Sequence, residues 1–413
     1  MPTAETSPKT LRPGFRLGPG LLVTAAFIGP GTVVTASKAG AQFGCQLLWT
    51  VVLASLGTIV LQSLAARLGI SQQKGLGEMI RSTLAESRWK RPAVALVIAS
   101  IGIGNAAYQT GNLTGAAAGL SPVFRIQTSS WLMILVTLTT TIIWLGRYKI
   151  LHRFLIAWVA ILSGSFLIAG LISLPESEQI LRGIVSPSID ADNLTIVLAL
   201  IGTTIVPYNL FLHASSAATT WQGENPRDAV RQSDWDTCFS VLLGGFVTAS
   251  ILTTASAAFY QSKINWNSID EIAVQLRPAL GDAGGVAFAV GLFAAGLTSS
   301  ITAPIATAYA VCGSLGWKAD PSSRRFRAIA IAVVWIGGYL AIHFGKSPAL
   351  TIQFAQVANG LLLPIVGCFL LAVVVKPKSS PLASLSRWRL VSAFFAVLAV
   401  ALLGIWRTIS VLR

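Results

Sequence analysis

The sequence predicts an all-α integral membrane protein with about eleven transmembrane helices. Of its 413 residues, 54% are hydrophobic and only 11% are charged, against roughly 25% charged in an ordinary soluble domain. Apolar runs recur along the whole chain, with lengths that suit the roughly 20 residues a helix needs to cross a bilayer. The cationic residues gather in alternate connections between these runs, which is the pattern that membrane topology produces.

The apolar runs define the expected elements in order. Residues 1–17 are polar and basic and predict a cytoplasmic N-terminal tail without a cleaved signal peptide, whereas 18–413 form a single transmembrane domain. We interpret the polar connections, including 174–193, as solvated loops. The expected spans are 19–41, 46–70, 93–119, 130–146, 151–173, 194–216, 237–260, 283–313, 327–344, 350–375 and 388–407.

The net charge of +15 reflects topology rather than nucleic-acid binding. If the N-terminus is cytoplasmic, the cytoplasmic connections and the span ends beside them carry 22 of the 30 Lys and Arg residues, the outer ones carry 7, and Lys38, within the first span, is assigned to neither side. This bias predicts a multi-pass cell membrane protein with its C-terminus outside and the lipid bilayer as its partner. We expect Lys38 to extend toward the interface. The oligomeric state stays open.

Two of the expected spans contain helix-breaking residues at their middle. Pro30 and Gly31 interrupt the first span, and Pro207 and Tyr208 interrupt the sixth. Proline removes a backbone donor and clashes with the preceding turn, and in a membrane the freed groups need protein or a wet cavity. One such break would be an ordinary kink. A matched pair, five spans apart, indicates a secondary transporter built from inverted repeats. The repeats are expected at about 18–173 and 194–375, with an extra helix at 388–407.

Five segments resemble the natural resistance-associated macrophage protein (NRAMP) family of divalent-metal transporters. The resemblance implies a leucine-transporter-like five-plus-five inverted repeat with broken helices 1 and 6, working by alternating access. The segments are 18–20 (GPG), 41–49 (AQFGCQLLW), 61–69 (LQSLAARLG), 207–213 (PYNLFLH) and 291–300 (GLFAAGLTSS).

The chain departs from the family pattern at the residues that the resemblance assigns to metal binding. The family's first broken helix reads Asp-Pro-Gly-Asn, where this chain has Gly29 and Thr32 in place of the two ligands. Val206 replaces a methionine, and Tyr208 replaces a histidine. Carboxylate, imidazole and thioether groups retain transition metals, so their loss predicts a harder, partly hydrated cation such as magnesium or manganese.

The remaining polar groups define a candidate binding site. Carbonyls at the end of each first half-helix favour a cation, and Gly29, Thr32 and Thr203 would supply backbone or hydroxyl oxygen to a metal. Gln356 corresponds to a glutamine that the family uses near its metal, although buried amides also simply join helices. The full predicted set is Ala26, Gly29, Thr32, Thr203, Val206, Asn209, Gln356 and Asn359.

Proton coupling needs a titratable group in the pathway, and few are available. The resemblance aligns an acidic relay with Asn105 and Tyr108, both neutral here. His213 is the one histidine of the sixth span and is interpreted as structural, with a relay role as the alternative. All the acidic residues fall in the tail or in solvated connections. We therefore expect weak proton coupling or none.

The predicted function is transport of a divalent cation without a cofactor. Two alternatives stay open, namely a transporter of a small anionic or zwitterionic solute and a non-transporting membrane sensor or enzyme. Against an enzyme, the sequence contains no Ser/His/Asp set, HExxH motif or phosphate-binding loop. The four separated cysteines predict neither a disulfide framework nor a zinc site.

Overall fold

The structure is a computed structural model that describes residues 18–146, 149–264, 268–345, 347–375 and 387–412. Over these ranges the chain forms a bundle of helices, and ten helical segments are long and apolar enough to cross a membrane. The first expected span, which is split into two short helices, is not among these ten, whereas the sixth, which is split in the same way, is. The all-α membrane architecture is therefore confirmed, whereas the predicted tail, 1–17, lies outside the described residues.

Each half of the bundle begins with a broken helix. The first half contains α1 (Pro19–Phe27), α2 (Pro30–Phe43), α3 (Leu48–Gln72), α5 (Lys90–Phe124), α6 (Thr128–Leu145) and α7 (Lys149–Ile172). The second contains α9 (Leu194–Thr204), α10 (Pro207–Thr220), α11 (Pro226–Ala255), α13 (Gly284–Leu315), α14 (Arg324–Phe344) and α15 (Pro348–Val375), followed by the extra helix α16 (Arg387–Leu412). The bounds of the two repeats stay a prediction.

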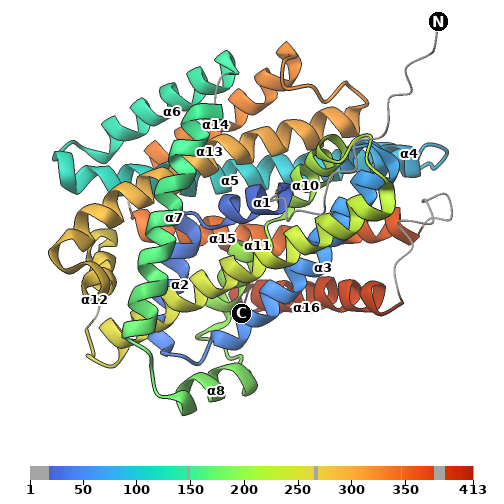
Figure 1. Cartoon of the computed structure of the whole chain (residues 1–413). Helices are drawn as coiled ribbons and strands as arrows, with labels where there is room; N and C mark the ends of the chain where they lie inside the picture. Colours follow the sequence, from blue (N-terminus) through green and yellow to red (C-terminus); the bar gives the residue numbers. More distant parts are fainter. Residues whose placement is uncertain (1–17, 147–148, 265–267, 346, 376–386, 413) are drawn as a thin grey trace, which may run out of the picture.

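The connections contain short helices rather than simple loops. They are α4 (Leu76–Thr83), α8 (Ser177–Val185) and α12 (Arg277–Leu280), with a π turn at Ser256–Tyr260 and 3₁₀ turns at Ile269–Leu276 and Gly281–Ala283. α4 and α12 lie at opposite ends of the bundle (Figure 1). The interpretation of 174–193 as a plain solvated loop was wrong, because α8 folds within it.

The two helix breaks have nearly the same backbone geometry. Ile28 and Ile205, the first residue of each break, have φ/ψ of −77°/72° and −94°/76°. The second residues, Gly29 and Val206, have φ/ψ of −118°/−174° and −82°/119°. Both second residues precede a proline, which excludes the helical conformation from its neighbour and then starts the next helix. The same local sequence logic therefore breaks both helices, as predicted.

Glycines let the helices around the breaks approach closely. A Cβ at Gly202 of α9 would overlap the backbone carbonyl of Gln356 of α15. On the other side, a Cβ at Gly296 of α13 would come within 2.7 Å of the Asn112 carbonyl of α5. Small residues allow such approach between membrane helices. These contacts bring the second broken helix against α15 and bring α13 against α5.

Asp236 corrects the prediction that every acidic residue lies in a solvated connection. Helix α11 begins at Pro226, so the segment predicted as a loop up to 236 is helical, and Asp236 is only 1% exposed. Its Oδ1 accepts a hydrogen bond from the Gly18 amide at 2.9 Å, and its Oδ2 accepts one from the Gly20 amide at 2.6 Å. A carboxylate here stabilises the start of α1, where unpaired amides and the positive end of the helix dipole coincide.

We expect Asp236→Asn to lower thermal stability. The side-chain NH₂ group of asparagine would face one of the two backbone N–H groups, which are also donors, so one hydrogen bond is lost. We expect the free energy of unfolding to fall by about 1–2 kcal/mol. Thermal unfolding of the purified protein in detergent measures it. The control is Glu86→Gln, which removes a carboxylate from an exposed position. Equal stability of the two variants would show that Asp236 does not stabilise α1.

Candidate functional site

Hydroxyl groups from surrounding helices converge on the carbonyl end of α1. The Ala26 carbonyl accepts hydrogen bonds from the Tyr108 hydroxyl at 3.3 Å and from the Ser299 hydroxyl at 3.2 Å. The Thr32 hydroxyl, across the break, donates to the Phe27 carbonyl. The negative end of the α1 dipole is thus satisfied by neutral donors that come from α2, α5 and α13.

A threonine pair joins the two broken helices. The Thr32 and Thr203 hydroxyl oxygens lie 2.7 Å apart, and both side chains are fully buried. Since a hydroxyl has one hydrogen and Thr32 gives its hydrogen to Phe27, Thr203 is the donor in this pair. Thr32 and Thr203, which were predicted to supply oxygen ligands from the two broken helices, therefore contact each other directly. Gly29 lies alongside, where a Cβ would approach the Ser299 hydroxyl to 3.0 Å.

The second break contributes polar atoms that lack a hydrogen-bond partner in this conformation. The Asn209 side chain donates weakly to the Val23 carbonyl at 3.5 Å, whereas its Oδ1 has no partner among the described residues. The Tyr208 hydroxyl is likewise unpartnered, and its ring lies 5.3 Å from that of Tyr108. Val206 is buried and offers only its backbone, whose carbonyl accepts from the Asn209 amide at 3.1 Å.

Gln356 and Asn359 face different neighbours. The Gln356 amide lies against Gly31, where any Cβ would overlap it, and within the described part of the chain its Oε1 has no hydrogen-bond partner. Asn359 is next to Gly104 of α5, and its Nδ2 has no hydrogen-bond partner in those same residues. Gln356 therefore lies beside the break in the first span, whereas Asn359 lies beside α5.

All of these groups are closed off from solvent in this conformation. The side chains of the predicted set are at most 1% exposed, including Gln356 and Asn359. An unpaired buried acceptor costs free energy, and the side-chain oxygens of Asn209 and Gln356 are two such acceptors among the described residues.

The predicted relay residues do not form a connected chain. The Asn105 amide donates to the Ala303 carbonyl at 3.2 Å and to the Thr307 hydroxyl at 2.5 Å. His213 Nδ1 lies 3.0 Å from Gln62 Oε1 of α3. Tyr108, by contrast, belongs to the site itself through its bond to Ala26.

Two contacts were missed from the sequence. Ser299 lies within the family-like segment 291–300 but is not in the predicted site, although its hydroxyl donates to the Ala26 carbonyl. Lys38 was expected to extend to the interface, but it is half-buried and donates to Gln353 Oε1 at 2.7 Å, which ties α2 to α15. Neither contact follows from spacing along one helix, because each joins helices far apart in sequence.

The ligand chemistry of the site is oxygen without fixed charge. Among the described residues, no group of three or more His, Cys, Asp or Glu side chains could hold a metal. The site instead offers two carbonyls at a helix end, several hydroxyls and two side-chain amide oxygens. Such a set suits a hard cation better than a soft one.

We expect Thr32→Val to destabilise the protein. The change leaves the Phe27 carbonyl and the Thr203 hydroxyl without their partner, at a cost of about 1–3 kcal/mol, whereas Thr32→Ser keeps the hydroxyl. Thermal unfolding in detergent checks both variants against Thr141→Val, which removes an exposed hydroxyl. If all three variants unfold at the same temperature as the unaltered protein, the threonine pair does not hold the broken helices together.

The comparisons with known proteins extend over nearly the whole chain. Residues 20–410 match the family model described as natural resistance-associated macrophage protein-like. A divalent metal cation transporter MntH of Xylella fastidiosa strain 9a5c is 28% identical over 95% of this chain and 86% of its own length. The MntH of Mesorhizobium japonicum is 29% identical over 84% of this chain and 78% of its own length.

Solved structures of membrane transporters also match nearly the whole chain. A manganese transporter of Eremococcus coleocola, crystallised with an aromatic bis-isothiourea compound, matches with a TM-score of 0.74 and 25% identity, over 95% of this chain and 86% of that one. Mhp1, a nucleobase-cation-symport-1 family transporter, matches with a TM-score of 0.55 and 15% identity, over 96% of this chain and 95% of that one, and supports the fold alone. With its paired helix breaks and a family match from residue 20 to residue 410, this chain belongs to the NRAMP family, whose members are transporters and not enzymes.

Proposed function

We propose that this protein carries a divalent metal cation across the membrane by alternating access. One observation supports the proposal above all others, namely the meeting of Thr32 and Thr203 beside the carbonyl end of α1. The two broken helices place their oxygen atoms together there. Half-helix ends that meet at the middle of a bilayer are where secondary transporters bind their ions.

Hydroxyl groups can satisfy the carbonyls at the end of α1 when the site is empty and can bind the ion when it is present. A hydroxyl donates to a carbonyl when the site is empty, and it can rotate to present a lone pair when a cation arrives. Thr32, Tyr108 and Ser299 all donate to the end of α1 in the present conformation. Loading then requires rotation of side chains rather than transfer of protons.

The ligand set favours a hard cation of the magnesium or manganese type. Gly29 offers only backbone, Thr32 and Thr203 offer hydroxyl oxygen, and the unpartnered oxygens of Asn209 and Gln356 complete the set. Without a fixed negative charge, a divalent ion binds weakly and keeps part of its water shell. The relatives named as divalent metal cation transporters and manganese transporter support metal as the substrate class.

Proton coupling is weak or absent in this proposal. The positions aligned with the family's relay hold Asn105 and Tyr108, and His213 is hydrogen-bonded to Gln62 outside the site. We also infer that the protein lies in the cell membrane with its N-terminus in the cytoplasm, because the cationic connections share one side.

Lys38 favours a second candidate, the transport of a small anionic or zwitterionic solute. Gly31 of α2 contacts Gln356 of α15. Two turns further along α2, Lys38 contacts Gln353, which is also on α15. A cationic side chain beside the site would repel a divalent metal and attract an anion. Thermal stabilisation by a non-metal solute, without stabilisation by any divalent ion, would favour this candidate.

We expect Gly29→Asp to strengthen manganese binding by about tenfold or more, because a carboxylate then faces the ion in a medium of low dielectric. The φ of Gly29 is −118° and suits any residue, and a Cβ added there would come within 3.0 Å of the Ser299 hydroxyl and 3.8 Å of the Tyr108 hydroxyl. Calorimetric titration of the purified protein with Mn²⁺ and Mg²⁺ measures the affinity. Gly29→Asn is the matched control, because it adds the same volume without charge.

Two outcomes would contradict the proposal. Equal affinities for the Asp and Asn variants would place the metal elsewhere. Absence of flux for every divalent ion in proteoliposomes, with the unaltered protein, would exclude metal transport.

We expect metal uptake into proteoliposomes to leave the internal pH unchanged. No acidic side chain of the described residues lies at either break, so no carboxylate is available to carry a proton with the ion. A pH-sensitive dye in the lumen, recorded beside metal uptake, measures proton movement. Acidification that follows the metal flux would show that His213 or another group relays protons.

A further inference from the structure

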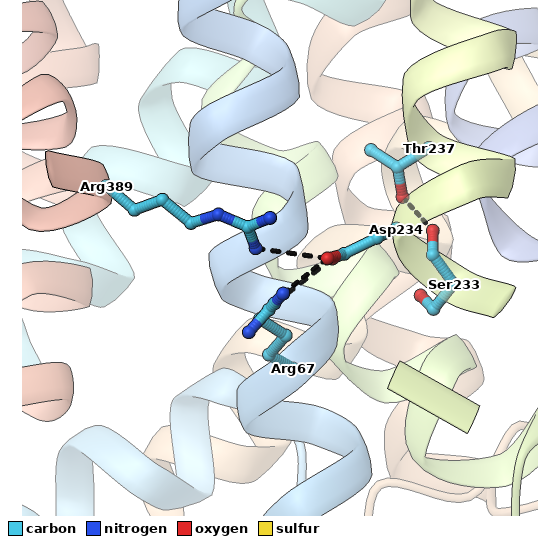
Figure 2. Close-up of polar contacts among 5 residues, drawn as sticks. All are labelled: Arg67, Ser233, Asp234, Thr237 and Arg389. Atoms are coloured by element: carbon cyan, nitrogen blue, oxygen red, sulfur yellow. Dashed lines mark hydrogen bonds and ion pairs between the residues drawn. The ribbon is translucent and has the colours of Figure 1, made fainter. Parts of the chain in front are cut away.

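A basic pocket lies away from the paired helix breaks, between α3, α11 and α16. It has a volume of about 540 Å³, which is within the range of small-molecule sites. Its polar lining consists of Ser63, Arg67, Asp234, Cys238 and three further arginines. Figure 2 shows that its central ion pairs come from three separate helices.

One carboxylate holds two of the arginines in place. Arg67 Nε donates to Asp234 Oδ1 at 3.1 Å, and a second Arg67 nitrogen contacts Asp234 Oδ2. Arg389 of α16 donates to the same Oδ2 at 3.0 Å (Figure 2). Asp234 therefore neutralises one of these two guanidinium groups and orients both toward the same pocket.

Two more arginines carry charge that no carboxylate balances. Arg227 and Arg231 line the pocket one helical turn apart on α11, are exposed, and form no ion pair among the described residues. With four arginines against one aspartate, the pocket wall has three uncompensated positive charges. A structural role in joining helices explains the Arg67–Asp234–Arg389 contacts, and the positive-inside bias accounts for the charge of Arg227 and Arg231, but neither accounts for the gathering of all four arginines around one pocket.

The other walls of the pocket are apolar and continue into a lipid-facing surface. Ile59, Val60, Val230 and Trp235 line it beside the arginines. Further exposed apolar side chains lie beyond it on the same three helices; they are Leu53 and Leu56 of α3, Phe239 and Phe246 of α11, and Phe394 and Phe395 of α16.

The pocket lies where all three helices change from polar to apolar. Arg67 is the first charged residue after the apolar part of α3, whereas Arg231 and Arg389 come just before the apolar parts of α11 and α16. This boundary belongs to the side of the membrane that the cationic connections predict to be cytoplasmic. A cation is repelled here by the arginines, whereas an anion with an apolar tail satisfies both kinds of wall.

We propose that this pocket binds the phosphate group of an anionic phospholipid. Guanidinium groups bind phosphate oxygens in pairs of parallel hydrogen bonds, and basic pockets between transmembrane helices select anionic headgroups. Arg227 and Arg231 supply free donors to the phosphate, Arg67 and Arg389 supply fixed positive charge, and the acyl chain lies along Trp235 and Val60. The bound lipid thereby links the extra helix α16 to α3 and α11.

Native mass spectrometry of the purified full chain in detergent tests this proposal. The protein is titrated with dioleoylphosphatidylglycerol and, separately, with dioleoylphosphatidylcholine. We expect a tighter one-to-one complex with phosphatidylglycerol and about tenfold or greater weakening in the Arg227→Gln/Arg231→Gln variant, since each basic residue near a membrane surface contributes to anionic-lipid binding. The matched control is Arg88→Gln/Arg324→Gln, which removes two exposed charges outside the pocket and should bind as the unaltered protein does.

A soluble headgroup separates a lipid site from a phosphate site. sn-Glycerol 3-phosphate should fail to displace the lipid at equal concentration, and Trp235→Ala should weaken lipid binding by about threefold or more through loss of apolar contact. Equal binding of the two lipids, equal weakening in the control variant, or displacement by the soluble headgroup would each overturn the proposal. Size-exclusion profiles and unfolding temperatures verify that every variant is folded.

Discussion

Backbone carbonyls that are freed in the middle of a membrane must find partners, and this requirement shapes the centre of the molecule. No bulk water reaches the end of α1, and an unsatisfied carbonyl in hydrocarbon costs several kcal/mol. The chain meets the requirement with hydroxyl groups from α2, α5 and α13, and Thr203 of α9 reaches the same network through Thr32. The need to satisfy the carbonyls at the end of α1 therefore helps to position the surrounding helices.

The same requirement accounts for the chemistry of the site. A carboxylate would repel helix-end carbonyls unless an ion were present, whereas a hydroxyl can satisfy them in an empty site. With Gly29 and Thr32 at the places where the family pattern has an aspartate and an asparagine, our proposal implies a site that is stable when empty and binds its ion less tightly. The gap left by Gly29 is small, since Ser299 and Tyr108 already approach it.

Three charged residues make contacts between helices around the candidate site. Asp236 fixes the start of α1, Lys38 ties α2 to α15, and Asp234 joins α3 to α16 through two arginines. Each lies where a helix begins or where two helices meet. Among the described residues, the candidate site itself contains only neutral side chains.

The sequence by itself determined the membrane class, the approximate spans and both helix breaks. Apolar runs and prolines act locally, so their length and spacing suffice to predict the spans and the breaks, and the resemblance to the family predicted the site residues beside the breaks. The tertiary structure decided the contacts between helices: Ser299 and Tyr108 at the end of α1, Asp236 beneath α1, Lys38 on Gln353, and the arginines of α3, α11 and α16 around one pocket. These pairs are separated by tens to hundreds of residues, and their side chains meet only because close packing at glycines fixes the distance and rotation of each helix. No periodicity along a single helix contains that information.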